Sequence, residues 1–373
     1  MNIVNIGTDK TLVGGASLGD AVERHRAYGR HLDHLDIIVY SPKREGLKEF
    51  KIADNVIGHP TNSWSKLGFM KDAERLFAKI HAQHKVDLIV CQDPFGPAVV
   101  GARLKKKYGV KLQINFHGDF FDNPFWLREH VRHRYYRRLA EKTILKADTI
   151  RIVSEALRPK LTKRYVKNED IYVIPTPVNL EKFQAEPSPQ RFDRPIILTV
   201  GRIVKAKDFP ILLATARLLV KQVSGLEWRI IGDGPLRRKF ERQTSSTLPQ
   251  LKWLNALPHD QLRPHYQAAS VLVSTSNNES FGKVFLEAAM AQVPVVATAT
   301  LGANNIVVNG ETGFLAPIGD PQRLAERIAY LILRPELVAQ MGEQAKQHAL
   351  SRFGWQRSID AMVQMWRQTV GHS

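Results

Sequence analysis

The sequence predicts an α/β protein made of two doubly wound parallel-sheet domains. Short apolar segments with strand character alternate with helical segments along both halves of the chain, and such alternation favours parallel sheets covered by helices. A proline-rich, turn-prone stretch at residues 175–189 separates the two halves. At 373 residues, the chain is too long for one compact core. We therefore place a first domain at residues 1–180 and a second at residues 190–354.

The individual elements follow from the apolar pattern. The expected strands are residues 3–7, 36–40, 87–91, 111–116, 149–153 and 171–174 in the first half, and 196–200, 228–231 and 271–274 in the second. A further strand and the loop that follows it are expected at 251–257. Helical segments include residues 19–31, 70–83, 97–108, 125–146, 155–165, 210–220 and 355–370. In doubly wound sheets ligands bind at the carboxyl ends of the strands, so the loops that follow the strands hold the candidate site residues.

Composition narrows the class of protein. A hydrophobic content of 43% is that of a globular protein, and the single cysteine, Cys91, allows no internal disulfide, which fits a reducing cytoplasm. The first residues lack the basic region and long apolar run of a signal peptide, and no apolar run reaches transmembrane length. We therefore expect a cytoplasmic protein.

The net charge of +18 implies an anionic partner, either a membrane surface or nucleic acid. Basic residues concentrate in one expected helix, at Arg128, Arg132, Arg134, Arg137, Arg138, Lys142 and Lys146. A basic amphipathic helix can lie on an anionic membrane, although many charge runs are only solvated helix faces. Tyr135 and Tyr136 among the cations also suit nucleic acid, but no nucleic-acid-binding module is recognisable, so we rank that partner lower.

The most informative stretch runs from Glu279 to Glu287 and contains Ser280, Phe281 and Gly282. It reads as a loop that becomes a helix near Phe281, because helix formers and apolar residues at helical spacing follow. A helix N-terminus binds phosphate, and a glycine there allows close approach. With a carboxylate on each side, the stretch suits a nucleotide-diphosphate sugar. The alternative is an ordinary solvated helix that carries two glutamates.

Three loops after expected strands add candidate residues. Gly14 and Gly15 follow the first strand, where paired glycines allow backbone contact with a ligand, or simply form a tight turn. His117 follows the strand at 111–116, with Asp119 nearby, and is either a site residue or a structural histidine. Arg202, Lys205 and Lys207 follow the strand at 196–200 and suit a diphosphate, although any one of them can be ordinary surface charge. There is no Asp-x-Asp and no clustered metal-ligand pattern, so we expect no metal and no cofactor.

These motifs together resemble a known family. The two glutamates eight residues apart with an internal Phe-Gly, followed by Pro294-Val295-Val296-Ala297-Thr298 and Asn309-Gly310-Glu311-Thr312-Gly313-Phe314-Leu315, resemble the retaining glycosyltransferases of family 4, over nearly the whole chain. The resemblance implies the GT-B fold, in which two Rossmann-like domains face each other across a cleft. It also implies that the first domain serves the acceptor, the second binds the nucleotide sugar, and the helix at 355–373 packs back on the first.

The resemblance also assigns roles to residues. Arg202 and Lys207 would contact the donor's diphosphate, Glu279 the sugar hydroxyls and Glu287 the ribose diol, while His117 would reach the donor sugar and the glycine-rich loop would lie at the cleft. It implies retention through attack on the same face, with the leaving phosphate taking the acceptor's proton. The chain departs from the family pattern where glycine is usual, at Asp208 and Asn255, in the linker at Thr176-Pro177, and near the sugar, where Asn305 replaces a glutamate.

The function expected from sequence is therefore a hexosyltransferase. It would move a hexose from a nucleotide-diphosphate sugar to a lipid-linked or polysaccharide acceptor at the inner face of the membrane, without a metal. Two other readings remain: a nucleotide-sugar epimerase of the same architecture, and a basic nucleic-acid-binding protein.

Overall fold

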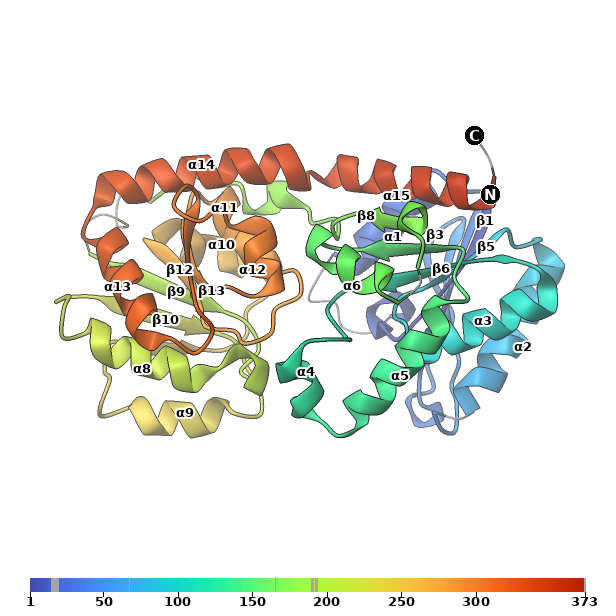
Figure 1. The fold of residues 1–373 in the computed structure, drawn as a ribbon, viewed down its shortest axis with the longest axis horizontal. Helices are drawn as coiled ribbons and strands as arrows, with labels where there is room; N and C mark the ends of the chain where they lie inside the picture. The colour runs from blue at the N-terminus through green and yellow to red at the C-terminus, as the bar shows by residue number, and fades with distance from the viewer. Residues whose placement is uncertain (15–19, 67, 165, 189–190, 192–193, 372–373) are drawn as a thin grey trace. The chain divides into compact units, whose positions relative to one another are not determined.

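The computed structural model describes residues 1–14, 20–66, 68–164, 166–188, 191 and 194–371. The chain divides into two compact units, each built around its own sheet (Figure 1). The first unit comprises Met1–Asp122, His130–Pro177 and Trp355–Ser373, and the second comprises Asn123–Glu129 and Val178–Gly354.

The first unit contains an eight-stranded sheet in the order β3-β4-β2-β1-β5-β6-β7-β8. Its strands are β1 (Asn2–Gly7), β2 (His34–Val39), β3 (Phe50–Ala53), β4 (Val56–Pro60), β5 (Leu88–Cys91), β6 (Lys111–Phe116), β7 (Thr149–Ile152) and β8 (Ile171–Val173). All neighbours pair in parallel except β3, which runs antiparallel to β4 at the edge. Strands β3 and β4 were not predicted from the sequence, because they are short and polar residues or glycine interrupt their apolar pattern.

The helices of this unit are α1 (Ala21–Gly29), α2 (Gly68–Gln83), α3 (Gly96–Tyr108), α5 (Arg132–Ile144), α6 (Arg158–Thr162) and α15 (Trp355–Val370). The C-terminal helix α15 packs against the first sheet (Figure 1). Its buried side chains Met362 and Trp366 join the same apolar core as Ile3. The indole of Trp366 donates a hydrogen bond of 2.6 Å to the Gln113 side chain on β6. The last helix of the chain is therefore part of the first unit.

The helix expected at residues 125–146 is interrupted. The structure has α4 (Pro124–Glu129) in the second unit and α5, which begins at Arg132, in the first. Asn123 starts α4, because its side-chain oxygen accepts hydrogen bonds from the backbone N–H groups of Phe125 and Trp126. The amide of Asn123 also donates to Asn278 at 2.9 Å. The single-helix prediction was wrong because neighbouring segments pack in different units, which apolar spacing does not reveal.

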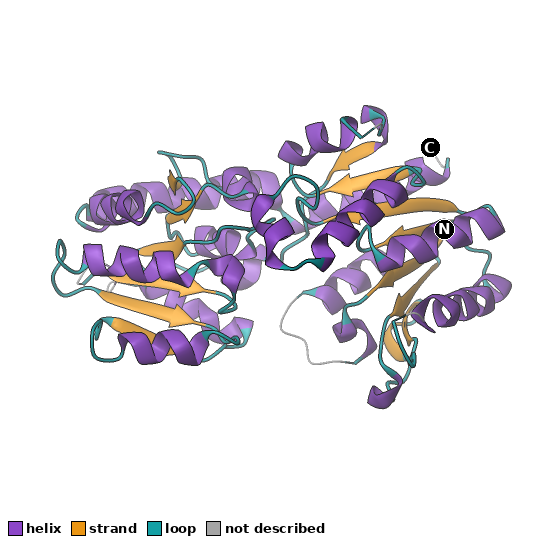
Figure 2. Cartoon of the chain, turned by 60° about the horizontal axis from the view of Figure 1, so that its bottom comes forward, coloured by secondary structure: helices purple, strands orange, loops and turns teal. Residues whose placement is uncertain are grey.

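The second unit contains a six-stranded parallel sheet in the order β11-β10-β9-β12-β13-β14, with helices on both faces (Figure 2). The strands are β9 (Ile196–Val200), β10 (Glu227–Ile231), β11 (Leu251–Leu254), β12 (Val271–Ser274), β13 (Val295–Thr298) and β14 (Gly313–Ala316). The helices are α8 (Phe209–Leu219), α9 (Arg237–Thr244), α10 (His259–Ala268), α11 (Lys283–Met290), α12 (Leu301–Ile306), α13 (Pro321–Ile332) and α14 (Pro335–Phe353). Two parallel-sheet α/β units confirm the predicted fold class.

One buried arginine fixes the ends of two helices in the second unit. Arg191 is only 2% exposed, and its guanidinium donates to four backbone carbonyls. Two belong to Tyr266 and Gln267 at the end of α10, and two to Ala291 and Gln292 just after α11. The last carbonyls of a helix lack partners within the helix and carry partial negative charge, so a cation there is favourable.

A neutral histidine plays a comparable part in the first unit. His25 on α1 is buried, and its Nδ1 lies 2.7 Å from the Ala21 carbonyl, to which it donates. Its Nε2 therefore accepts from the Asn5 amide at 3.1 Å, and the Asn5 oxygen accepts from Gln92 at 2.9 Å. Burial, together with nearby Arg24, lowers the pKa of His25 to about 4. The network joins α1, β1 and the end of β5 through uncharged groups.

Candidate active site

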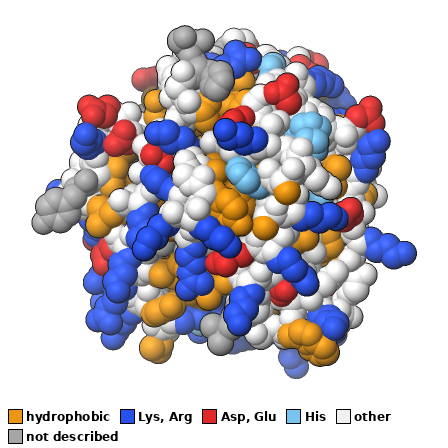
Figure 3. Space-filling model, turned by 90° about the vertical axis from the view of Figure 1, so that its right-hand side faces the viewer, with side chains coloured by type: hydrophobic (Ala, Val, Ile, Leu, Met, Phe, Trp, Pro, Cys, Tyr) orange, Lys and Arg blue, Asp and Glu red, His pale blue; other side chains and the backbone are white. Residues whose placement is uncertain are grey.

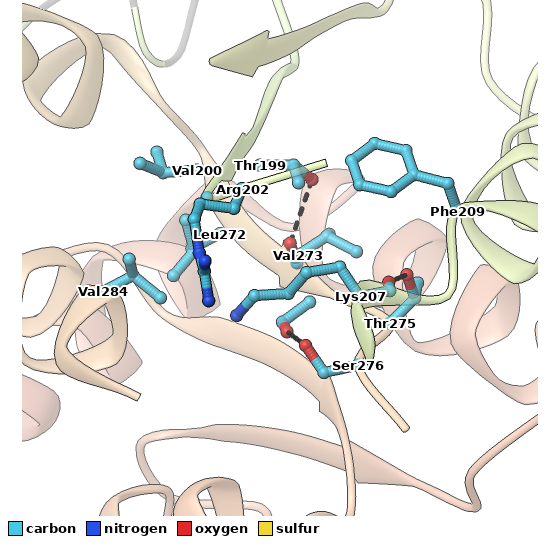
Figure 4. Close-up of a pocket in the computed structure, with 12 residues that line it drawn as sticks. Thr199, Val200, Arg202, Lys207, Phe209, Leu272, Val273, Thr275, Ser276 and Val284 are labelled. Carbon is cyan, nitrogen blue, oxygen red and sulfur yellow. Dashed lines mark hydrogen bonds between the residues drawn. The ribbon is translucent and has the colours of Figure 1, made fainter. Parts of the chain in front are cut away.

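The site in the second unit lies at the carboxyl ends of β9 and β12. A small cavity there is lined by the loop after β9, which carries Arg202 and Lys207, and by the residues that end β12 and follow it. The two cationic side chains converge on this cavity from one loop, and Val284 at the start of α11 lines its other side (Figure 4). The structure thus brings together Arg202 and Lys207, the two residues predicted to bind the diphosphate, and the helix whose N-terminus is predicted to bind phosphate.

Lys207 also contacts Glu279, the residue that is predicted to bind the sugar hydroxyls. Its ammonium forms an ion pair with the Glu279 carboxylate, and both side chains are mostly buried. The backbone around the pair is fixed as well, since the Thr275 hydroxyl donates to the Lys207 carbonyl at 2.9 Å and Asn277 N–H donates to the Ala206 carbonyl at 3.0 Å. The two loops that carry the site are therefore hydrogen-bonded to each other.

Glycine at position 232 permits this arrangement. Gly232 has φ +154°, and a Cβ there would lie 2.0 Å from the Gly201 carbonyl oxygen. The turn that begins at Gly232 packs directly on the cationic loop, where the Ile203 N–H donates to the Asp233 carbonyl at 2.8 Å. This close packing shapes the loop that holds Arg202.

Asp208 keeps a backbone geometry that glycine would adopt easily. Its φ of +47° lies in the left-handed region, immediately before α8. Aspartate is among the residues that tolerate this conformation. Asp208, which stands where the family usually has glycine, therefore keeps the left-handed backbone conformation next to Lys207.

The helix of the central stretch starts later than predicted. Helix α11 begins at Lys283, not near Phe281, because Gly282 has φ +78° and stands just before the helix. A Cβ at Gly282 would lie 2.4 Å from the Phe285 ring, so glycine is required there. Phe281 is buried against the Phe353 ring, which leaves Ser280 as the half-buried member of this turn.

Glu287 is buried on α11 and accepts a hydrogen bond from a residue that the sequence analysis did not select. The Tyr266 hydroxyl donates to its Oε2 at 2.7 Å, and the two side chains are 0% and 3% exposed. Burial, and then the Glu287 charge, raises the pKa of Tyr266 well above its usual range, so the phenol stays protonated and donates. A lone tyrosine in an amphipathic helix gives no sequence signal of this contact.

Helix α12 lies against the same turn. Gly302 N–H donates to the Glu279 carbonyl at 2.8 Å, and a Cβ on Gly302 would meet the Phe281 backbone at 2.7 Å. Asn305 follows on this helix, and its buried side-chain nitrogen has no hydrogen-bond partner among the described residues. Asn305 does not line the cavity beside Arg202 and Lys207, so its part in the site stays a prediction.

Comparison with known proteins decides the family. The family model described as "Glycosyl transferases group 1" matches residues 181–348, and "Glycosyltransferase Family 4" matches residues 26–182. Together the two matches span most of the chain. The protein is a family 4 glycosyltransferase of the GT-B fold.

Individual relatives agree with this family. The transferase is 28% identical to an uncharacterized glycosyltransferase of Methanocaldococcus jannaschii, over 89% of each chain. It is 23% identical to the GDP-mannose-dependent alpha-(1-6)-phosphatidylinositol monomannoside mannosyltransferase of Mycolicibacterium smegmatis, over 86% of this chain and 87% of the relative. Its fold matches sucrose-phosphate synthase of Thermosynechococcus elongatus with a TM-score of 0.86, at 20% identity and over all of both chains.

The transferase's first unit carries the remaining predicted residues at the carboxyl ends of its own strands. Gly14 has φ +82° and ends a short 3-10 helix at Lys10–Val13, while Gly15 lies outside the described residues. His117 directly follows β6 and is half-buried. Asp119 is buried, pairs with Lys160 and accepts from two backbone N–H groups of the turn that follows it. Through these contacts Asp119 stabilises the loop that follows His117.

Sequence analysis did not select Asp93, which follows β5 at the same edge. One of its carboxylate oxygens accepts from the Phe95 N–H at 2.8 Å. Burial raises the pKa of Asp93 to about 6, so this carboxyl group binds a proton just below neutral pH.

Two absences complete the description. Within the described ranges, no group of three or more His, Cys, Asp or Glu side chains is arranged to hold a metal ion. None of the described helices is long and apolar enough to span a bilayer.

Proposed function

We propose that this glycosyltransferase moves a hexose, with retention, from a nucleotide-diphosphate sugar to a lipid-linked or polysaccharide acceptor at the inner face of an anionic membrane. The observation that carries the proposal is the convergence of Arg202, Lys207 and Glu279 at the start of α11. Two cations and a helix N-terminus suit a diphosphate, and a carboxylate beside them suits sugar hydroxyls.

The proposed chemistry is electrostatic. As the bond between the sugar's anomeric carbon and the diphosphate oxygen breaks, negative charge grows on the leaving diphosphate, where Arg202 and Lys207 stabilise it. The acceptor hydroxyl forms the new glycosidic bond on the same face and gives its proton to the leaving phosphate. No residue then needs to act as nucleophile or general base, and the two cations take the place of a metal.

Other residues would orient the donor. The buried Glu287, held by Tyr266, is suited to the ribose diol, because its fixed carboxylate can accept from hydroxyl groups. The sugar contact that the family resemblance implies for His117 stays a prediction.

The acceptor proposal rests on the relatives and on the surface of α5. The Mycolicibacterium smegmatis relative is named for a phosphatidylinositol-based acceptor. On α5 and its ends, exposed cations stand beside exposed apolar side chains, namely Arg132, Arg134, Arg138, Lys142 and Lys146 with Val131, Tyr135 and Leu145. Figure 3 shows one face of the protein, over which Lys and Arg side chains are widely spread. Such a surface suits anionic headgroups.

The first experiment measures nucleotide release from UDP-, GDP-, ADP- and dTDP-sugars, with and without a bacterial lipid extract. We expect release from one donor, a rise with lipid, no effect of a metal chelator, and loss in Glu279→Gln. Glu343→Gln is the matched control, because that glutamate is exposed on α14. Conversion of a donor without any acceptor would instead indicate an epimerase, and an inverted anomeric product would contradict retention.

The membrane proposal has its own test. Sedimentation with vesicles of phosphatidylglycerol, compared with phosphatidylcholine, should show binding only to the anionic lipid. Binding should fall in Arg134→Glu/Arg138→Glu and persist in Arg323→Glu/Arg334→Glu, which places the same charge change on and after α13 of the second unit. Equal binding of both double variants would refute a role for α5.

A further inference from the structure

A polar cavity also lies in the first unit, beside the outer strands of its sheet. Its volume is about 160 Å³, and it lies between α2 and the strands β2 and β4. The side chains that line it are His34, Asp36, Glu49, Asn55, His59 and Lys79, with Gln83 and His84 at the end of α2. His34 and Asp36 stand in the amino-terminal half of β2, whereas the transferase residues follow the carboxyl ends of strands. The family motifs therefore do not account for this cavity.

A buried histidine clamped by two carboxylates forms one wall of the cavity. His59 Nε2 lies 2.7 Å from Asp36, and its Nδ1 lies 2.9 Å from Glu49. Carboxylates only accept hydrogen bonds, so both ring nitrogens must carry protons. Burial alone lowers the pKa of His59, but the hydrogen bonds to Asp36 and Glu49 outweigh that effect and raise it. The ring is therefore an imidazolium that holds both carboxylates in place.

The charges of the cavity cancel. Two carboxylates, Asp36 and Glu49, face the His59 imidazolium and the Lys79 ammonium. An anion would meet two carboxylates, and a cation would meet two positive groups, so neither is favoured. Both nitrogens of His59 are already hydrogen-bonded, and no metal-binding cluster occurs among the described residues. A neutral ligand fits best.

The remaining lining suits a polyhydroxylated ligand. Carboxylate oxygens accept, while the Lys79 ammonium and the Gln83 amide donate, and hydroxyl groups can satisfy both kinds of partner. Ile57 and Leu76 are only partly buried and give the cavity an apolar side. The rings of His34 and His84 stack with their centroids 3.7 Å apart. A few placed polar groups on an apolar surface are typical of a small-molecule site, and this one is smaller than a drug-sized pocket.

We infer that this cavity binds a single neutral sugar residue, as part of a glycan chain, at a site separate from the donor site. An enzyme that extends a glycan gains from a second contact, because it raises the effective concentration of the chain. The inference does not depend on which donor the transferase uses, since none of the proposed donor ligands lines the cavity.

Titration calorimetry and histidine-selective NMR of the full chain test this inference with methyl glycosides of glucose, galactose, mannose and N-acetylglucosamine. At least one glycoside should bind in the millimolar range and shift imidazole signals of the cavity histidines. Lys79→Ala and Gln83→Ala, both on the exposed side of α2, should weaken binding about tenfold, as expected when a hydrogen bond is lost. Arg75→Ala, one turn earlier on the same helix and outside the cavity, should leave it unchanged.

The controls separate this site from the donor site. Glu279→Gln should abolish transfer yet keep glycoside binding, and Lys79→Ala should keep nucleotide release from the donor. If no glycoside binds at millimolar concentration, the inference is wrong. If inorganic phosphate shifts the same histidine signals, the inference that the ligand is neutral is wrong. If Glu279→Gln loses glycoside binding, the sugar binds in the donor site.

Discussion

The two units anchor helices with different chemistry. In the second unit, Arg191 binds four backbone carbonyls at the ends of α10 and α11, the helices that carry Tyr266 and Glu287. In the first unit, the neutral His25 links α1 to β1 through Asn5. Burial lowers the pKa of Arg191 only to about 10, so this anchor stays charged at neutral and acid pH, whereas His25 must remain unprotonated. The comparison predicts that acid acts first on the unit that holds His117.

The largest effect should come from Arg191→Ala. Four charge-assisted hydrogen bonds are lost and four buried carbonyls lose a donor, so the free energy of unfolding of the second unit should fall by about 4 kcal/mol. Chemical denaturation monitored at Trp228, which is buried in that unit, measures it. Arg194→Ala is the control, because Arg194 forms only a surface ion pair with Glu227 and should cost less than about 1 kcal/mol. Equal losses of stability in the two variants would contradict the proposed role of Arg191 in anchoring α10 and α11.

Acid should act next through His25. Its pKa is about 4 in the folded protein and 6.5 when unfolded, so below pH 6.5 the unfolded chain takes up a proton that the native chain does not. The stabilisation is complete above pH 6.5 and is lost as pH falls toward 4, by about 3 kcal/mol in total. In His25→Gln this part of the pH dependence should disappear, as measured by denaturation at a series of pH values. His31→Gln, at an exposed position, should retain it.

Tyr266→Phe should have a smaller effect, in the second unit. It removes one buried hydrogen bond to Glu287, which corresponds to about 2 kcal/mol in the free energy of unfolding. If Tyr266 positions Glu287 for the donor, nucleotide affinity should fall as well, measured by calorimetry with nucleoside diphosphates. Tyr330→Phe, at a ring that is 43% exposed, should change neither quantity. Lost stability with unchanged affinity would contradict the proposed ribose contact.

Asp208→Gly should have the smallest effect. Glycine relieves the left-handed strain at φ +47° but adds backbone entropy to the unfolded chain, so stability should rise by no more than about 1 kcal/mol. Asp208→Val should instead destabilise the protein, because a β-branched residue is disfavoured in that region. Thermal unfolding of the pair gives the sign of each change. If Asp208→Val stabilised the protein, the turn would not require the left-handed conformation at position 208.

Sequence reasoning predicted the parts of the fold that depend on local pattern. Segments such as Ile196–Val200 and Val271–Ser274 are continuous apolar runs because parallel strands are buried on both faces, and both became strands. Phe50–Ala53 became a strand only because β4 lies beside it, and no local pattern carries that information.

The site shows the same division. Cations after the strand at 196–200 are visible in the sequence, but only the family resemblance selected Arg202 and Lys207 rather than Lys205, and Glu279 was selected from the loop-to-helix stretch 279–287. The structure brings Arg202 and Lys207 to one cavity and pairs Lys207 with Glu279. Tyr266 and Arg191 could not be selected, because their roles depend on partners 21 to 101 residues away in the chain. The roles of His117 and Gly14 stay predictions.

The return of α15 to the first unit affects how the protein can be made in a cell. A ribosome releases the chain from its N-terminus, and domains usually fold in that order. Here the core that contains Ile3 also includes Met362 and Trp366, which are synthesised only after the whole of the second unit. The second unit ends at Gly354 and can close before them. We therefore expect the first unit to finish folding after the second, and removal of α15 to expose the apolar core beside β1.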